Sequence, residues 1–248
     1  MEMNNKMVFA TTVLAGSLFL VACHDTSLPV EPDPVTPPPA EGNALTIIND
    51  GVPAEGFSLI VGSNTEGYAH TDLAKDATYE KANSIKVTPS THDGDYAWKV
   101  ETFNSGTGGA AEVNFIIGND ASPLDLTDYQ AGTMLIDLSV VVAAASETGD
   151  HQIQLQTNTG TDDYKNRKAF YFSQNQLADL EADGWQTVAV PMSCFSVQDE
   201  TGAFDITKVH QPLRFVIKQD EQVTYEIGKV VISDSAVAPE GAVAWTCE

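Results

Sequence analysis

The sequence predicts an all-β domain, an antiparallel β-sandwich of two sheets in the jelly-roll arrangement, in an exported chain. Three observations predict this fold. Short segments in which apolar and polar residues alternate recur between residues 43 and 248, as they do in strands with one buried face. Clusters of Gly, Asn, Asp and Pro separate these segments, and only one segment has the pattern of a helix. Many short strands at such spacing favour a sandwich over an α/β fold.

The N-terminus has the features of a lipoprotein signal peptide. An apolar run over residues 8–22 ends at Cys23, and about 15 apolar residues are fewer than the roughly 20 that cross a bilayer as a helix. We therefore interpret residues 1–22 as a signal peptide and Leu-Val-Ala-Cys as a lipobox, with the Cys23 thiol accepting the lipid (diacylglycerol, then palmitate). Because His24, and not aspartate, follows the cysteine, we expect a lipid anchor in the outer membrane, with the domain periplasmic or surface-exposed.

Residues 23–42 form a second region that has almost nothing to bury. It carries Pro29, Pro32, Pro34, Pro37, Pro38 and Pro39 among small and acidic residues. Proline favours extended polyproline II geometry, at about 3.1 Å per residue, so we expect a tether that holds the domain away from the lipid. Residues 43–248 contain no second proline-rich break and no repeat, which predicts one domain.

The charge of the chain limits its partners. The sequence has 35 acidic and 12 basic residues, and its formal net charge is −23. Nucleic acid is not expected as a partner, because a phosphate backbone needs a clustered basic surface. A polyanionic polysaccharide is disfavoured by the same repulsion, whereas a neutral ligand is not.

The cysteines predict one disulfide. Three cysteines occur, and lipidation of Cys23 leaves Cys194 and Cys247 as a pair in an oxidising compartment. A bond between them closes a long loop and is worth about 2–4 kcal/mol.

The domain divides into predicted strands with one short helix at 174–183. The strands are 44–48, 57–61, 84–87, 97–102, 112–117, 133–142, 151–157, 167–172, 185–191, 213–218 and 223–232. In 151–157 the alternation points Ile153 and Leu155 to the core and three glutamines to the other side. In 167–172 it points Phe170 and Phe172 inward.

The polar sides of five strands carry side chains that suit a sugar. They are Asp137, Gln152, Gln154, Gln156, Arg167, Tyr171, Trp185 and Arg214. Amides, carboxylates and guanidinium groups form paired hydrogen bonds to vicinal hydroxyls, and aromatic rings stack on sugar C–H faces. If these strands share a sheet, the side chains form one carbohydrate-binding surface. Every half-exposed sheet has a polar side, so an ordinary solvent-facing surface also fits the pattern.

The other aromatic residues have separate expected positions. Trp98 alternates in phase with the apolar Val100, so we expect it in the core. Trp245 lies near Cys247, where we expect it to pack beside the disulfide. Tyr68 and Tyr164 fall in predicted loops, where rings are more often available to a ligand.

Several segments resemble a known family. Residues 124–129 read Leu-Asp-Leu-Thr-Asp-Tyr and residues 132–138 read Gly-Thr-Met-Leu-Ile-Asp-Leu, which resembles the galactose-binding-like jelly rolls of marine bacterial glucanases, the ExoP C-terminal type. Residues 185–195, Trp-Gln-Thr-Val-Ala-Val-Pro-Met-Ser-Cys-Phe, are similar to that family's strand ending in Pro-Leu-Ser-Cys-Phe. The resemblance continues in residues 204–209, 212–213 and 227–232.

The resemblance implies a module of carbohydrate-binding character, either attached to a glycoside hydrolase or carried alone on a lipoprotein. It lies mainly at scaffold positions, so no binding residue transfers from it. Modules of this shape commonly hold a structural calcium where their terminal strands meet, and Asp50 and Asp234 are the candidate ligands at strand ends. Chance placement fits equally well in so acidic a chain. No other cofactor is expected, since the five histidines lack zinc-ligand spacing.

Three functions remain as hypotheses. The first is a non-catalytic glycan-binding lipoprotein of the envelope, for a neutral polysaccharide such as a β-glucan, with glycanases or a TonB-dependent transporter as partners. The second is a structural or protein-interaction lipoprotein. The third is a polysaccharide lyase or glycoside hydrolase of jelly-roll fold. The third is disfavoured, because the chain reads Gln-Ile-Gln where similar lyases have Gln-Ile-His, and lacks their arginine-rich strand.

Overall fold

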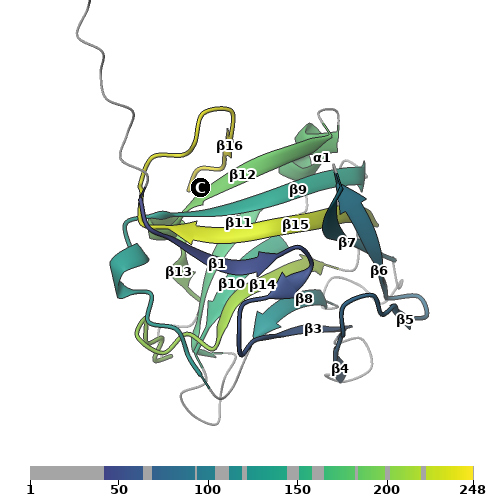
Figure 1. Ribbon diagram of the computed structural model, residues 1–248, viewed down its shortest axis with the longest axis horizontal. Coiled ribbons are helices and arrows are strands. Elements are labelled where there is room, and N and C mark those ends of the chain that lie inside the picture. The colour runs from purple at the N-terminus through teal and green to yellow at the C-terminus, as the bar shows by residue number, and fades with distance from the viewer. Residues whose placement is uncertain are drawn as a thin grey trace, which may run out of the picture. The chain divides into compact units, whose positions relative to one another are not determined.

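Two β-sheets stacked face to face form the domain (Figure 1). The computed structural model describes residues 42–63, 69–92, 94–103, 112–118, 122–143, 151–157, 165–181, 184–198, 202–218 and 222–247. These residues belong to the compact unit Glu41–Glu248. Strand pairing in the two sheets is antiparallel except between β12 and β16, which confirms the predicted all-β sandwich. In the described part of the chain, no helix has the length and apolar character required to span a membrane.

Sheet A has nine strands in the order β16-β12-β9-β15-β7-β6-β5, with β1 beside β15 and β2 beside β1. They are β1 (Ala44–Asn49), β2 (Val52–Pro53), β5 (Tyr79–Lys81), β6 (Ile85–His92), β7 (Asp95–Thr102), β9 (Thr133–Ala143), β12 (Trp185–Pro191), β15 (Val223–Ser233) and β16 (Val243–Ala244). The long strand β15 pairs with β9 on one side, and with β7 and then β1 on the other.

Sheet B has seven strands in the order β13-β11-β10-β14-β8-β3-β4. They are β3 (Ser58–Ser63), β4 (Ala69–Asp72), β8 (Glu112–Gly118), β10 (His151–Gln156), β11 (Arg167–Phe172), β13 (Ser196–Val197) and β14 (Gln211–Lys218). The helical elements are α1 (Gln174–Glu181) and the 3-10 turns η1 (Thr127–Tyr129) and η3 (Met192–Cys194).

Every predicted strand has a counterpart, but β6 extends further than expected. The alternation predicted its end at Val87, before Pro89, whereas the strand continues to His92. The short strand β5 pairs only with residues 85–87 of β6. Beyond that point one edge of β6 is unpaired in the sheet order, and a proline is tolerated at an unpaired edge because no ladder hydrogen bond is lost.

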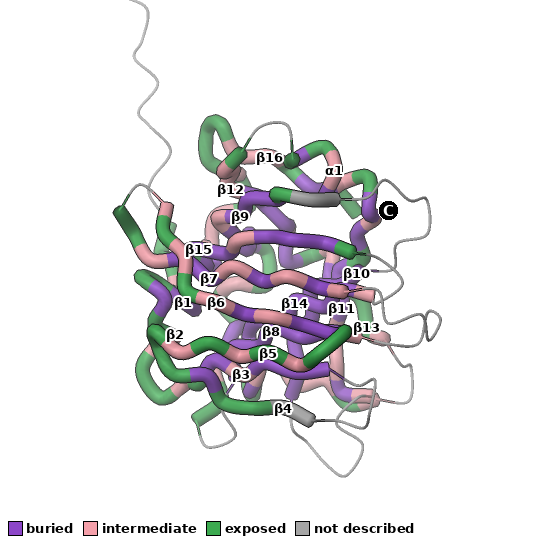
Figure 2. Tube along the Cα trace, turned by 90° about the vertical axis from the view of Figure 1, so that its right-hand side faces the viewer, coloured by how far each residue is buried: buried purple, intermediate pink, exposed green. Residues whose placement is uncertain are grey.

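The core lies between the sheets and follows the predicted alternation. Trp98, Phe170 and Phe172 are buried, as predicted, and buried segments run along the strands of both sheets (Figure 2). Trp245 is also buried and stacks on Phe172, with ring centroids 4.9 Å apart. The predicted Cys194–Cys247 disulfide is present, with Cα atoms 5.1 Å apart.

The helix α1 begins with a reciprocal cap. The Ser173 hydroxyl oxygen accepts the Gln176 backbone N–H at 3.3 Å, and the Gln176 side-chain oxygen accepts the Ser173 N–H at 2.8 Å. Such a capping box satisfies two donors that a helix start otherwise leaves unpaired. Leu177 and Leu180 then bury one face of this single α-helix of the described chain.

Candidate functional site

The predicted carbohydrate contacts lie on opposite faces of the sandwich. Asp137 on β9 and Trp185 on β12 are on the outer face of sheet A, and the other six are on the outer face of sheet B. The strands β9 and β12 pair with each other and β9 with β15, whereas β10 pairs with β11 and β14. The condition for one shared surface is therefore not met.

On sheet B, five polar side chains form what we name the amide layer. Its members are Asn114 on β8, Arg214 on β14, and Gln152, Gln154 and Gln156 on β10. Each alternates with an apolar residue that belongs to the core, so the amide layer faces away from the core. The strands β8, β14 and β10 are direct neighbours, and Arg214 lies opposite Gln154 in the register.

The Arg214 guanidinium links the two sides of the amide layer. Its Nε donates to Asn114 Oδ1 at 3.0 Å, and its Nη1 lies 3.5 Å from Gln156 Oε1. The same Gln156 oxygen accepts a hydrogen bond of 2.5 Å from Arg167 Nε. The Gln156 side-chain oxygen on β10 thus accepts hydrogen bonds from guanidinium groups on the two strands that flank it, β11 and β14.

Gln152 is the second centre of the amide layer. Its Oε1 accepts hydrogen bonds from Nε2 of Gln154 and, at 2.7 Å, from Nε2 of Gln198. Gln198 was not predicted as a site residue, because the strand β13 before it has only two residues and shows no alternation. Asn114 was not predicted either, although the alternation of β8 places this residue on the outer face.

The amide layer is buried, and residues beside it on β11 are more exposed. Its five side chains are between 0% and 6% exposed, whereas the neighbouring Tyr171 is 39% exposed and Arg167 is half-buried. Among the buried atoms of the layer, the donor Asn114 Nδ2 and the acceptor Gln154 Oε1 have no hydrogen-bond partner in the described part of the chain. An unpaired buried polar atom costs about 1–3 kcal/mol. A donor and an acceptor of this kind are both satisfied by hydroxyl groups, which donate and accept.

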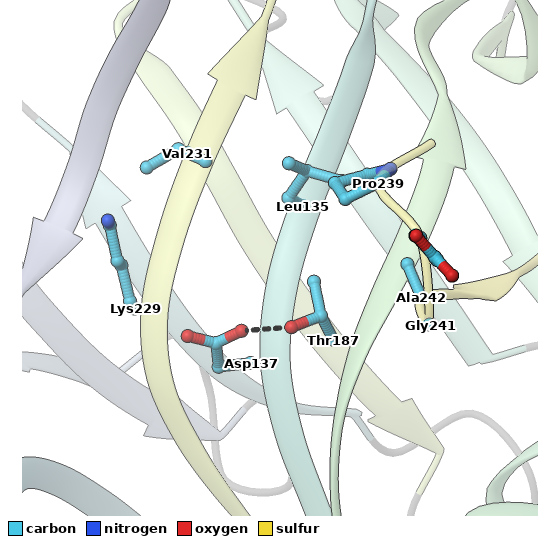
Figure 3. A pocket seen from close by; sticks show the side chains of 9 residues that line it. Leu135, Asp137, Thr187, Lys229, Val231, Pro239, Gly241 and Ala242 are labelled. Atoms are coloured by element: carbon cyan, nitrogen blue, oxygen red, sulfur yellow. Dashed lines mark hydrogen bonds between the residues drawn. The ribbon is translucent and has the colours of Figure 1, made fainter. Parts of the chain in front are cut away.

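A separate hollow, the sheet A groove, lies on the opposite face (Figure 3). It measures about 330 Å³. It is lined by Leu135, Asp137, Thr187, Lys229, Val231, Pro239, Glu240, Gly241 and Ala242. The Thr187 hydroxyl donates to Asp137 Oδ1 at 2.7 Å, and Lys229 lies beside them on β15 (Figure 3).

A smaller hollow of about 70 Å³ continues from the sheet A groove and shares Asp137 and Lys229 with it. Trp185 and His92, which both line it, stack with ring centroids 4.3 Å apart and planes 19° apart. Trp185 was expected on an exposed side, and it lies half-buried on the outer face. Gly228 lies next to this ring, and a Cβ there would make an ordinary van der Waals contact of 3.4 Å with the indole Cζ3.

The candidate calcium ligands are not brought together. Asp50 and Asp234 flank β1 at opposite ends, and six strand residues span about 20 Å. The hydrogen bond and charge of Lys75, 3.2 Å away, lower the pKa of Asp50, as does the Tyr96 backbone N–H. Asp234 accepts a 3.2 Å hydrogen bond from the Asn43 amide. Among the described residues, no three His, Cys, Asp or Glu side chains gather as a metal site.

Three residues named from the sequence, Cys23, Tyr68 and Tyr164, lie outside the described residues.

Solved structures share this fold at low sequence identity. The extra C-terminal domain of the exo-1,3/1,4-β-glucanase ExoP from a Pseudoalteromonas species is 12% identical with a TM-score of 0.55, over 82% of this chain and 98% of that domain. The structure of the exo-1,3/1,4-β-glucanase ExoP is 11% identical with a TM-score of 0.54, over 83% of this chain but 22% of the glucanase. A family 11 carbohydrate-binding module of the Clostridium thermocellum cellulase Lic26A-Cel5E is 10% identical with a TM-score of 0.50, over 80% and 98%.

No curated protein sequence matches the chain. A family model described as galactose-binding domain-like (Exop_C) matches residues 68–232, which is more than half of the 248 residues. This range includes the strands of the amide layer and the β9, β12 and β15 strands of the sheet A groove. The chain therefore belongs to the galactose-binding-like family of ExoP-type C-terminal domains.

Proposed function

We propose that this domain binds a neutral polysaccharide, such as a β-glucan, through the amide layer of sheet B. The observation that carries the proposal is that a buried donor of the layer, Asn114 Nδ2, and a buried acceptor, Gln154 Oε1, have no hydrogen-bond partner among the described residues. A sugar hydroxyl that displaces the cover of these buried atoms accepts from Asn114 Nδ2 and donates to Gln154 Oε1. Tyr171, opposite Gln152 on the neighbouring strand β11, is exposed and offers a ring on which sugar C–H groups stack.

The charge of the chain and its relatives support a neutral glucan as the ligand. A net charge of −23 repels a polyanionic chain at long range, while a neutral chain meets no such barrier. The names of two similar structures include an exo-1,3/1,4-β-glucanase, and that of the third a carbohydrate-binding module of a cellulase. These names describe those proteins and favour β-glucans as the first probes.

The decisive experiment measures binding of laminarin and barley mixed-linkage β-glucan by calorimetry. Gln154→Met removes the amide while keeping the length of the side chain, and Tyr171→Ala removes the exposed ring. We expect each to weaken binding by about tenfold or more, the equivalent of about 1.4 kcal/mol. Gln130→Met, an exposed glutamine at the end of η1, is the matched control and should bind as the wild type does.

Stability separates this role from a purely structural one. Gln154→Met loses one hydrogen bond to Gln152 but also removes an unpartnered oxygen, so the free energy of unfolding should change by no more than about 1 kcal/mol. If ordered water alone satisfies the layer, the variant will bind both glucans with unchanged affinity. That result, or a wild type that binds neither glucan, would overturn the proposal.

We also propose that lipid on Cys23 and the proline-rich tether keep the domain at the cell envelope, near glycanases or a TonB-dependent transporter. Tethering raises the effective concentration of a binding domain without any new contact. Cys23→Ser should move the protein from the membrane fraction to the soluble fraction, with unchanged glucan binding after purification. Continued membrane association of this variant, checked in detergent-free fractions, would contradict the anchor.

A further inference from the structure

The sheet A groove has a defined floor and a wall that is held in place. Strands β9, β12 and β15 form the floor, and residues 239–242 form the wall (Figure 3). Directly after the wall, β16 pairs with β12, and the Trp245 N–H donates to the Ala189 carbonyl oxygen at 2.9 Å. The Cys194–Cys247 disulfide fixes the same segment to η3. The groove is therefore built by paired strands and by a segment that the disulfide holds in place.

Two charged side chains of the groove, Asp137 and Lys229, do not satisfy each other. Asp137 uses Oδ1 to accept the Thr187 hydroxyl, and its Oδ2 has no partner among the described residues. Lys229 is exposed and forms no ion pair with any described side chain. An ammonium group and a carboxylate side by side, both accessible, suit a ligand whose hydroxyls accept from one and donate to the other.

Apolar and aromatic groups accompany these polar atoms. Leu135, Val231 and Pro239 supply apolar surface to the groove, and the stacked rings of Trp185 and His92 line its extension. Alternating apolar and hydrogen-bonding surface matches a sugar ring, which has C–H faces and a hydroxyl rim. A volume of about 330 Å³ is at the lower end of the range for ligand pockets, so the ligand is short.

We infer that the sheet A groove is a second glycan site, which binds a short neutral segment on the face opposite the amide layer. The inference takes its class of ligand from the proposed function, but it stands on different residues. Glu240 also lines the groove, so two carboxylates face one ammonium group, and a uronate chain is disfavoured there. A domain with sites on two opposite faces holds two glycan chains at once and cross-links them.

Calorimetry with laminarihexaose tests the number of sites. We expect two hexasaccharides per wild-type chain. The double variant Asp137→Asn/Lys229→Met should weaken groove binding at least about tenfold, leaving one site of unchanged affinity. The amide oxygen introduced by Asp137→Asn would still accept the Thr187 hydroxyl, so the fold is kept. Lys86→Met, on the same face and paired with Glu80 at 3.9 Å, removes the same charge outside the groove and should retain two sites.

Cross-linking gives a second readout. Long laminarin should form light-scattering aggregates with the wild type, and neither the groove double variant nor Gln154→Met should form them, although both still bind. If the wild type has one site and the groove double variant binds with the same stoichiometry and affinity, the second site is wrong and the proposed function still stands. Loss of all binding in the groove double variant, with Gln154→Met unaffected, would overturn the amide-layer assignment instead. Absence of wild-type binding would overturn both.

Discussion

Trp185 and His92 stack across the outer face of sheet A, although the strands β9, β15 and β7 lie between their own strands in the sheet order. Both rings and Gly228 line the same small hollow, and Gly228 lies next to the Trp185 ring. The stacking thereby holds the half-buried Trp185 ring at the smaller hollow that continues from the sheet A groove, and the ring lines this hollow.

Trp185 should report on ligand binding by fluorescence. The chain has three tryptophans, and the other two, Trp98 and Trp245, are 0% and 4% exposed in the core. A glycan in the groove changes the solvation of the Trp185 indole, so laminarihexaose should shift the emission of the wild type. Trp185→Phe should abolish the shift, and a shift that persists in this variant would place the ligand elsewhere.

Acid should destabilise the fold through two similar turns. The Asp125 carboxylate accepts hydrogen bonds from the hydroxyl and N–H of Thr127, and Asp205 does the same with Thr207. These hydrogen bonds lower the pKa of each aspartate below its ordinary 3.8, and the bond from the threonine hydroxyl has the largest effect. Their contribution to stability is therefore complete above pH 3.8 and is lost as pH falls through the lower pKa of the folded state.

Urea unfolding at pH values between about 2 and 6 measures this loss. Asp125→Asn and Asp205→Asn keep an acceptor oxygen at each turn but do not titrate. The free energy of unfolding of the double variant should therefore fall less than that of the wild type as the pH is lowered. An identical pH dependence in both proteins would show that other carboxylates dominate.

Reducing the disulfide should affect the two faces differently. Cys194 and Cys247 are 53 residues apart, and opening a loop of this length should lower the free energy of unfolding by about 2–4 kcal/mol. The wall of the sheet A groove should also loosen, so Cys194→Ser/Cys247→Ser should weaken groove binding. Binding at the amide layer, measured in the same calorimetric titration, should be unchanged. Equal weakening at both sites would indicate general loss of structure.

Two glycines should differ sharply in their tolerance of alanine. A Cβ on Gly132 would lie 1.8 Å from the Ser233 backbone oxygen, whereas a Cβ on Gly228 would lie 3.4 Å from the nearest atom, in the Trp185 ring. We expect Gly132→Ala to lower the free energy of unfolding by about 3 kcal/mol or more, because backbone cannot yield as a side chain does. Gly228→Ala should cost about 1 kcal/mol or less in the same thermal unfolding assay.

The sequence predicts the strands of this domain better than their partners. Alternation places Gln154 and Asp137 on outer faces, because a period of two follows from the pleat of a single strand. It contains no information on which strand lies beside which. The assignment of β9 to one sheet and β10 to the other depends on contacts between distant segments, and the predicted binding residues were divided between two faces for this reason.

Very short elements were missed for a related reason. The strands β2, β13 and β16 have two residues each, too few to show any period. Gln198, which completes the hydrogen bonds of Gln152 in the amide layer, lies just after one of them. The disulfide, in contrast, was predictable because counting the cysteines of a chain that is expected to be exported needs no geometry.

The floor of the sheet A groove also bears on how the chain folds. Strands β9, β12 and β15 are neighbours in space, but β10, β11, β13 and β14 of the other sheet come between them along the chain. Contacts between segments so distant in sequence form late and slowly during folding. A chain arrested early, with only hairpins such as β6–β7 or β10–β11 in place, has no groove. Ligand capture in the groove is thus a kinetic marker of the completed topology.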